Sequence, residues 1–341
     1  MHRTSVLKAT VASSAVILLA GCFSGGPQRP ASTVPGAPSV TQPQTRLSVP
    51  LGVVSQYAGA ARRQLLSRSV SPATTVGKDL FVSNSTPTGG TEIEVLKHKT
   101  YKNIGAITDG VNGADGIWVD KIGDLYVANS LAPNVTEYAP GGNSPICTYS
   151  SELVGPSNGT TDRAGNVYVV DFNHFKSPGY IDKYTRCSNV VAQQYSIPLG
   201  PEGVAVDKHG NIFVSFVSSS GNGSFEEFKK GSKTPTALQV TTGPPGGLVV
   251  DGKGNLISDD QRGSIDVIAP PYTSATTLVS GLYNPFHLAL NKKQTLLFNV
   301  DTGAETVTVY KYPSGTLVTT LGTANGITNP AGVAGSPAAV F

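Results

Sequence analysis

Short apolar segments separated by polar turns recur along most of the chain in a fixed order. One unit consists of residues 116–120, 123–127 and 135–138, with the first segment ending in Asp and the second beginning with Gly. The Asp or Asn that ends the first segment stands at positions 120, 162, 207, 251 and 291, so successive copies are 42, 45, 44 and 40 residues apart. A period of this length, with three or four short strands per unit, is typical of the blades of a β-propeller.

Each unit has the residue types that a blade needs. The first segment is apolar, and we predict that it forms the strand nearest the ring axis. The Asp-x-x-Gly turn after it reverses the chain, because Asp accepts local backbone hydrogen bonds and Gly adopts positive φ without steric cost. The second segment is β-branched or aromatic, as expected for a strand buried between neighbouring blades. One blade cannot bury its own faces, so the repeat predicts a closed ring.

The two ends of the periodic region supply one further blade. Residues 79–84 match a second strand and residues 93–96 a third, but no clear first strand precedes them. Residues 330–334 match the first strand at 201–205, with no second strand after them. Five whole units and this composite make six. The sequence therefore predicts an all-β, six-bladed β-propeller over residues 71–341, in which a C-terminal strand closes the first blade.

These units resemble NHL-type repeats and their six-bladed relatives over about residues 75–341. The resemblance implies the fold but not one activity, because related propellers serve as scaffolds, ligand binders, lactonases and lyases.

The N-terminus has a different composition from the repeats. Residues 1–21 have a weakly basic start and a short apolar stretch, which predicts a signal peptide rather than a membrane-spanning helix. Leu19-Ala20-Gly21-Cys22 resembles the lipobox of bacterial lipoproteins, which implies cleavage before Cys22 and its acylation; the alternative is an ordinary secretory signal with a chance cysteine. Phe23, in place of Asp, favours the outer membrane by analogy with lipoprotein sorting. We therefore expect a lipid-anchored protein of the bacterial cell envelope.

Residues 22–70 are predicted to form a disordered tether between the lipid and the propeller. The segment is rich in Pro, Ser and Thr and has few large apolar side chains, so it cannot bury enough surface to offset its ordering entropy.

Composition and charge narrow the classes of partner. Gly (39) and Pro (24) are abundant, which suits many strands joined by turns. Only 14% of the residues are charged and the formal net charge is +3, without a basic run containing interleaved aromatic residues. This pattern does not favour nucleic-acid binding. We expect a monomer with a protein or glycan partner.

Cys147 and Cys187 are the two cysteines of the predicted propeller. In an oxidising envelope such a pair is a disulfide candidate. Both lie late in consecutive blades, where the outer strands diverge, so two unpaired thiols are the alternative. We expect the disulfide on balance.

The loops that enter the first strands should meet at one mouth of the central channel. They contain Asp115, Asn158, Glu202 and His287. The gluconolactonase family, also six-bladed, holds a divalent metal at this mouth, and Asp115-Gly116 and Glu202-Gly203 look similar to its ligand positions. The chain departs from that family because Asn158 replaces a recurring Gly and three blades offer neither carboxylate nor amide. Alternatively, Asp115 and Glu202 cap backbone groups or face water, and Asn158 replaces Gly because it tolerates positive φ.

Two functions follow from these alternatives. The first is a non-enzymatic scaffold or binding protein without a cofactor. The second is a metal-dependent hydrolase or lactonase that uses the channel mouth. The repeats are regular, and no blade has a long insertion rich in His, Asp and Glu, which favours the first. Polar residues also recur at the end of the second strand, and a position that recurs in every copy favours a structural role: Asn84, Asn129, Asp171 and Asp260.

Overall fold

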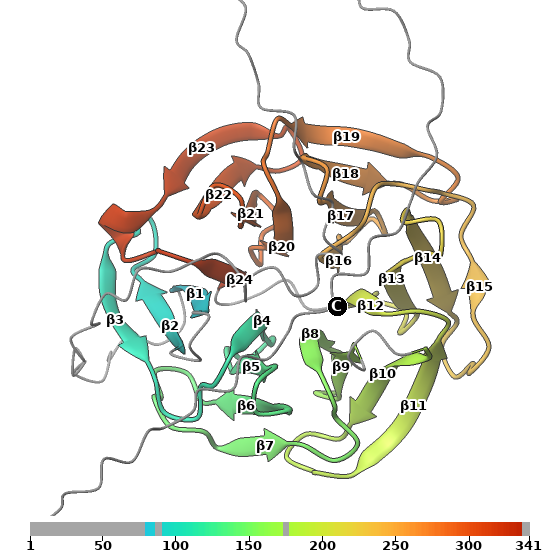
Figure 1. Cartoon of the computed structure of the whole chain (residues 1–341), viewed down its shortest axis with the longest axis horizontal. Helices are drawn as coiled ribbons and strands as arrows, with labels where there is room; N and C mark the ends of the chain where they lie inside the picture. Colours follow the sequence, from blue (N-terminus) through green and yellow to red (C-terminus); the bar gives the residue numbers. More distant parts are fainter. Residues whose placement is uncertain (1–78, 86–90, 173–176, 336–341) are drawn as a thin grey trace, which may run out of the picture. The chain divides into compact units, whose positions relative to one another are not determined.

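The computed structural model describes residues 79–85, 91–172 and 177–335, and these residues are predominantly β-structure. Their strands form six four-stranded antiparallel sheets. Figure 1 shows the sheets as blades around a central axis, with one strand of each blade innermost. The prediction of an all-β, six-bladed propeller is confirmed.

Each blade is built from an inner strand to an outer strand. Blade 1 contains β24 (Pro330–Gly335), β1 (Leu80–Ser85), β2 (Thr91–Leu96) and β3 (Asn103–Ile107); blade 2 contains β4 (Ala114–Val119), β5 (Leu125–Asn129), β6 (Asn134–Tyr138) and β7 (Cys147–Tyr149); blade 3 contains β8 (Pro156–Thr161), β9 (Val167–Asp171), β10 (Gly179–Tyr184) and β11 (Val191–Ile197). Blade 4 contains β12 (Pro201–Val206), β13 (Ile212–Val217), β14 (Gly223–Phe228) and β15 (Thr236–Ala237); blade 5 contains β16 (Leu248–Val250), β17 (Leu256–Asp260), β18 (Ser264–Ile268) and β19 (Ala275–Ser280); blade 6 contains β20 (Pro285–Leu290), β21 (Leu296–Asp301), β22 (Thr306–Lys311) and β23 (Thr316–Leu321), followed by the short 3₁₀ helix η3 (Thr323–Asn325).

The ring closes through the composite blade, as the sequence predicts. β24 is antiparallel to β1, with Val333 opposite Val82 and Ala334 opposite Phe81. The approach to the next blade is close: a Cβ on Gly332 would lie 2.5 Å from the carbonyl oxygen of Asp115 in β4. Glycine is therefore required here because another inner strand lies against it.

The apolar core lies largely between neighbouring blades. One cluster joins Tyr168 and Ile181 of blade 3 to Val204 and Val214 of blade 4. Another joins Val300 of blade 6 to side chains of blade 1. Burial of one such aliphatic side chain contributes about 1.5–3 kcal/mol, and most of it requires the adjacent blade. Stability is therefore a property of the closed ring.

Carboxylate-capped turns reverse the chain after the inner strands. In blade 2, Oδ1 of Asp120 accepts the backbone N–H groups of Ile122, Gly123 and Asp124. Gly123 has φ 101°, in the left-handed region that favours glycine. The same arrangement recurs at three further Asp residues and one Asn: Asp162, Asp207, Asp251 and Asn291. The repeated Asp-x-x-Gly pattern thus has a structural cause.

The polar residue at the end of the second strand fixes the loop that enters the inner strand. The carboxylate of Asp171 accepts the N–H groups of Val154 and Gly155, at 3.0 and 2.8 Å. Asp260 accepts the N–H of Gly243 at 2.7 Å. Asn84, Asn129 and Asp301 make related bonds in their blades. These contacts agree with a structural role for the recurring position, and they hold the loops around the channel in place.

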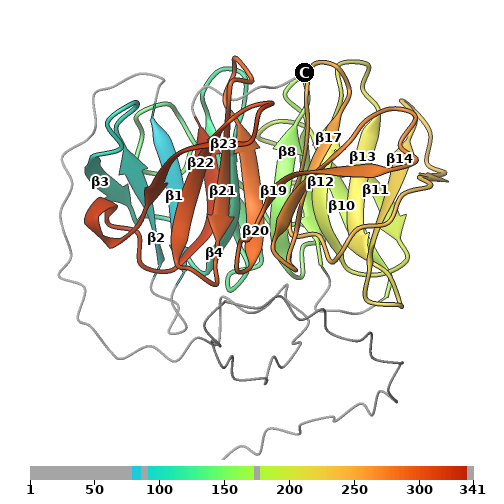
Figure 2. The same cartoon turned by 90° about the horizontal axis from the view of Figure 1, so that it is seen from above.

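The inner strands all begin at one end of the ring, which we call the entry end, and finish at the other, the exit end. Figure 2 shows the blades edge-on, with the strands running between the two ends. The predicted signal peptide, the acylated Cys22 and the tether to residue 70 lie outside the described residues. Among the described residues, no helix is long and apolar enough to cross a membrane.

Candidate functional site at the entry end of the channel

The second and third residues of the inner strands decide what the channel presents at its entry end. By position in the blades, the second residues are Asp115, Ser157, Glu202, Gly246, Phe286 and Ala331, and the third residues are Gly116, Asn158, Gly203, Gly247, His287 and Gly332. Asp115, Glu202 and His287 are all buried. The four residues that the sequence places at this mouth therefore come from the inner strands of blades 2, 3, 4 and 6.

Asp259 is a third carboxyl near this end, and it was not predicted from the sequence. It lies in β17, the second strand of blade 5, and is fully buried. One of its carboxylate oxygens accepts the N–H groups of Gly246 and Gly247. At the equivalent position other blades have Ser83 or Ser215, so the departure of one copy from the repeat was the available signal.

Burial, more than charge, determines the protonation of these carboxyls. Desolvation raises the pKa of Asp115 to about 8. Desolvation also raises the pKa of Glu202 well above its usual range, and the nearby carboxyls of Asp115 and Asp259 raise it further. For Asp259, burial raises the pKa while the N–H groups of Gly246 and Gly247 oppose the rise. Asp115 therefore favours its protonated form at neutral pH, and burial shifts the pKa of Glu202 and Asp259 in the same direction.

His287 stays neutral for the same reason. Burial lowers the pKa of its imidazole to about 4, although the carbonyl oxygen of Ala331 opposes the change. Nδ1 lies 2.9 Å from that oxygen. A carbonyl can only accept, so Nδ1 donates the proton and Nε2 retains a lone pair. A Cβ on Gly247 would lie 3.3 Å from Cα of His287 and 3.2 Å from Oδ2 of Asp259, which places both residues beside the same glycine.

Asn158 occupies its glycine-like position for a reason other than the one suggested by the sequence. It is not among the described residues with positive φ, and neither is Gly116 or Gly203, so tolerance of positive φ does not explain the pattern. The recurring glycine is explained instead by the close approach of the neighbouring blade, because a Cβ on Gly203 would lie 2.6 Å from the backbone nitrogen of Leu248. Oδ1 of Asn158 accepts the N–H of Gly159 at 2.8 Å, so the amide is turned back on its own strand.

Several buried polar atoms at this end have no hydrogen-bond partner among the described residues. They are Oδ1 of Asp115, Oγ of Ser157, Oε2 of Glu202, Oδ2 of Asp259 and Nε2 of His287. Ser157 lies on β8, between the strands that hold Asp115 and Glu202. Unpaired buried polar atoms are costly in a folded protein, and their concentration here marks the candidate site.

The spacing of the carboxyls does not suit one directly coordinated ion. Oxygens that share a divalent cation bind it at about 2.0–2.6 Å, so they must lie close together. Among the described residues, Asp115, Glu202 and Asp259 do not bring three ligand atoms within 4.8 Å of one another. Burial also raises the pKa of each of these carboxyls, so an ion would have to compete with protons. Asp115, Glu202 and Asp259 therefore do not form a three-carboxylate site for one ion.

Farther along the same strands, the channel contains a small cavity. Its volume is about 80 Å³, and its lining includes apolar residues such as Ile117 and Leu248 as well as the polar residues Asn158, Thr160 and Thr161. A cavity of about 150 Å³ is the size that holds benzene, so this one does not accommodate a sugar-sized ligand.

The fold and the site together define a six-bladed propeller with a cluster of buried carboxyls at one end of its channel. No protein-family model matches the chain, and no curated protein matches its sequence. A solved nidogen/laminin complex contains a chain with 17% identity and a TM-score of 0.62, covering 78% of this chain and 100% of that one.

Two further solved structures are similar in fold. One is a functionally unknown protein from Desulfotomaculum acetoxidans, with 14% identity, a TM-score of 0.54, and coverage of 76% of this chain and 98% of that one. The other is a gluconolactonase from Xanthomonas campestris, with 13% identity, a TM-score of 0.52, and coverage of 66% and 84%. Similarity at these identities establishes the propeller fold alone.

Proposed function

We propose that the chain is a non-enzymatic binding propeller of the bacterial cell envelope, held at the membrane by lipid on Cys22. Its partner is a protein or a glycan, which it contacts with the loops at the entry end. The buried carboxyls beneath those loops position the inner strands and do not perform chemistry. The fold is compatible with this role, because propellers present loops from every blade on one face.

The observation that supports a binding role is a set of exposed apolar side chains on the loops of the ring, which the exit-end loops carry at Ile122, Ile146 and Val190 and the entry-end loops carry as follows. Leu131 follows the second strand of blade 2 and is 49% exposed, and Tyr283 precedes the inner strand of blade 6 and is 67% exposed. Val154, before the inner strand of blade 3, is 40% exposed. Apolar and aromatic side chains favour binding once a partner removes them from water, and tyrosine is enriched at such interfaces.

Photocrosslinking from single positions tests this surface. A photoreactive residue at Tyr283 or Leu131 should give one discrete adduct in cells of the native host. The same residue at Ile122, which is 54% exposed but lies in a turn at the exit end, is the matched control. Protease digestion of the adduct would identify a protein, and muramidase digestion a glycan. Equal labelling from both ends, or none from the entry end, would contradict the proposal.

The alternative is a metal-dependent hydrolase or lactonase that uses Asp115, Asn158, Glu202 and His287. The unpartnered atoms of Asp115 and Glu202 are the observation in its favour. The spacing of the carboxyls and their protonation speak against it. Turnover of a lactone panel that depends on an added divalent cation and is lost in Glu202→Gln would replace the binding proposal with this one.

A further inference from the structure

The outer edges of blades 2 and 3 are joined by the turn between β10 and β11. Cys187 in this turn forms a disulfide with Cys147 of β7, with the two Cα atoms 5.3 Å apart. Of the two states that the sequence left open, the structure contains the disulfide. Asn189 of the same turn accepts the backbone N–H groups of Ser150 and Ser151, at 2.6 and 2.9 Å. The turn thus holds the neighbouring blade by covalent and polar contacts.

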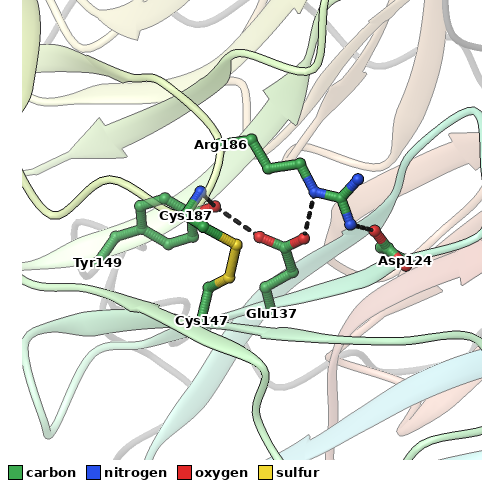
Figure 3. Close-up of a disulfide and its surroundings, with 6 residues drawn as sticks. All are labelled: Asp124, Glu137, Cys147, Tyr149, Arg186 and Cys187. Carbon is green, nitrogen blue, oxygen red and sulfur yellow. Dashed lines mark hydrogen bonds and ion pairs between the residues drawn. A yellow bond between two sulfur atoms is a disulfide. The ribbon is translucent and has the colours of Figure 1, made fainter.

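A buried carboxylate lies against this disulfide (Figure 3). Glu137 of β6 is fully buried, and its Oε1 accepts a hydrogen bond from Nε of Arg186 at 2.8 Å. Its Oε2 accepts the hydroxyl proton of Tyr149 at 2.5 Å, and that hydroxyl in turn accepts the N–H of Cys187 at 3.0 Å. Arg186 also pairs with Asp124. The carboxylate is therefore held in one orientation from two sides.

The two sulfurs and one oxygen of Glu137 lie within 4.8 Å of one another, and no other three acidic, histidine or cysteine side chains in the described residues do so. Zinc binds sulfur at about 2.3 Å and carboxylate oxygen at about 2.0–2.2 Å, so two ligands of one ion are separated by up to about 4.6 Å. We propose that, once the disulfide is reduced, Cys147, Cys187 and Glu137 bind one zinc-like divalent cation.

Reduction of the Cys147–Cys187 disulfide requires a reductant, for which a dithiol is sufficient. The dithiol transfers two electrons and two protons to the S–S bond, so that bond breaks, two S–H bonds form, and the dithiol becomes a disulfide. The cation then displaces both thiol protons and forms two bonds to sulfur. Cys187 is exposed, so the reductant and the cation can reach the pair.

Glu137 can serve as the third ligand without losing its present partners. Each carboxylate oxygen has two lone pairs, so it can accept one hydrogen bond and still bind an ion. Arg186 and Tyr149 would orient the ligand, as partners of metal ligands commonly do. The cation would thereby replace the covalent link between blades 2 and 3 with a coordinate one.

Cobalt titration tests the proposal. A chain that begins at residue 22 and contains Cys22→Ser retains only the two relevant thiols. It is reduced with a phosphine, freed of reductant without oxygen, and titrated with Co²⁺. We expect a thiolate-to-cobalt charge-transfer band that saturates at one equivalent and disappears when Zn²⁺ is added. The oxidised chain should show no such band, and neither should the reduced Cys147→Ser variant.

Two measurements test whether the carboxylate of Glu137 is a ligand of the cation. Glu137→Gln should weaken zinc binding at least about tenfold in competition with a chromophoric chelator. Glu227→Gln is the matched control, because Glu227 is the equivalent buried residue of blade 4 and pairs with Lys229. X-ray absorption of the reduced, zinc-loaded parent chain avoids any effect of substitution on folding. It should show two sulfurs at about 2.3 Å and oxygen at about 2.0–2.2 Å. A four-sulfur shell, no thiolate band, or unchanged affinity in folded Glu137→Gln would overturn the proposal.

Discussion

Burial changes the chemical behaviour of the individual polar residues in the channel, because it raises the pKa of their carboxyl groups. Asp115 and Glu202 are residue types that suit a metal or catalytic site, and the sequence shows them at a plausible position. In the structure their environment disfavours ionisation, because the surrounding strands remove water from them. Burial therefore favours the neutral form of both side chains, and each has an oxygen without a hydrogen-bond partner among the described residues. A carboxyl in the same sequence position but open to solvent would behave in the opposite way.

Stability should fall as the pH rises through the ionisation of Asp115. The pKa of about 8 in the folded chain lies well above the ordinary value of 3.8 for an aspartate, so the folded state holds the proton more tightly. This contribution is fully present below about pH 4 and is lost as the pH approaches 8. One pKa unit corresponds to about 1.4 kcal/mol, so the upper limit is on the order of 6 kcal/mol. Asp115→Asn should reduce the difference in unfolding free energy between pH 5 and pH 9, measured by urea denaturation.

A control separates this effect from the general charge of the protein. Asp109 is exposed, and Asp109→Asn removes the same charge without removing a buried carboxyl. It should leave the difference between pH 5 and pH 9 unchanged. If Asp115→Asn also leaves that difference unchanged, Asp115 is ionised in the folded chain and the neutral site is wrong.

The same neutral state predicts that the disulfide-bonded propeller does not bind divalent cations in its channel. Calorimetric titration with Ca²⁺, Mg²⁺, Mn²⁺ and Zn²⁺ should give no heat that differs between the parent chain and the Asp115→Ala, Glu202→Ala double variant. The physical reason is that binding must ionise carboxyls whose pKa values are raised, and that the three carboxyls do not bring three ligand atoms within 4.8 Å of one another. Binding at one equivalent that the double variant loses would favour the hydrolase alternative.

At the scale of elements, the repeat made the blades predictable from sequence. Asp120 and its equivalents mark each hairpin because a local backbone turn requires them, so the signal is present within a few residues. The outer strands were less predictable, and β7 and β15 contain only three and two residues. The contacts that Arg186 and Asn189 of blade 3 make with blade 2 were not predictable, because they join different blades and have no fixed sequence spacing. Asp259 was not predicted because the equivalent position of the second strand holds a small or apolar residue in the other blades, such as Ser83 or Ser215.

The closing strand should be indispensable to the ring. A chain that ends at residue 329 lacks β24, which leaves the inner edge of β1 unpaired and removes Val333 and Ala334 from two apolar clusters. Unpaired strand edges and exposed apolar faces promote aggregation. We expect the truncated chain to aggregate or to melt at a much lower temperature. A chain that ends at Gly335 retains β24 and is the matched control. Equal melting temperatures for the two chains would contradict closure by this strand.

At the scale of the whole molecule, closure of the ring explains why so many residues of the chain are needed for the fold itself. Each blade depends on its neighbours for burial, so the residues between blades are constrained, and the loops at the two ends are freer to vary. Leu131, Val154 and Tyr283 are exposed at the entry end although nothing in the blades requires apolar side chains there. This asymmetry between constrained strands and exposed loops is what a binding scaffold needs.

Lipid attachment would place this binding surface at a membrane, and it rests on Leu19-Ala20-Gly21-Cys22. A single acyl chain gives only marginal membrane binding, whereas several chains on one cysteine hold a protein firmly, because each buried methylene contributes about 0.8 kcal/mol. The full chain, expressed in a bacterial host, should therefore enter the detergent phase in a phase-separation assay, and Cys22→Ser should remain in the aqueous phase. Cys187→Ser removes a cysteine elsewhere and is the matched control; it should partition like the parent. A parent chain that stays in the aqueous phase would show that Cys22 is not acylated and that the protein is released rather than anchored.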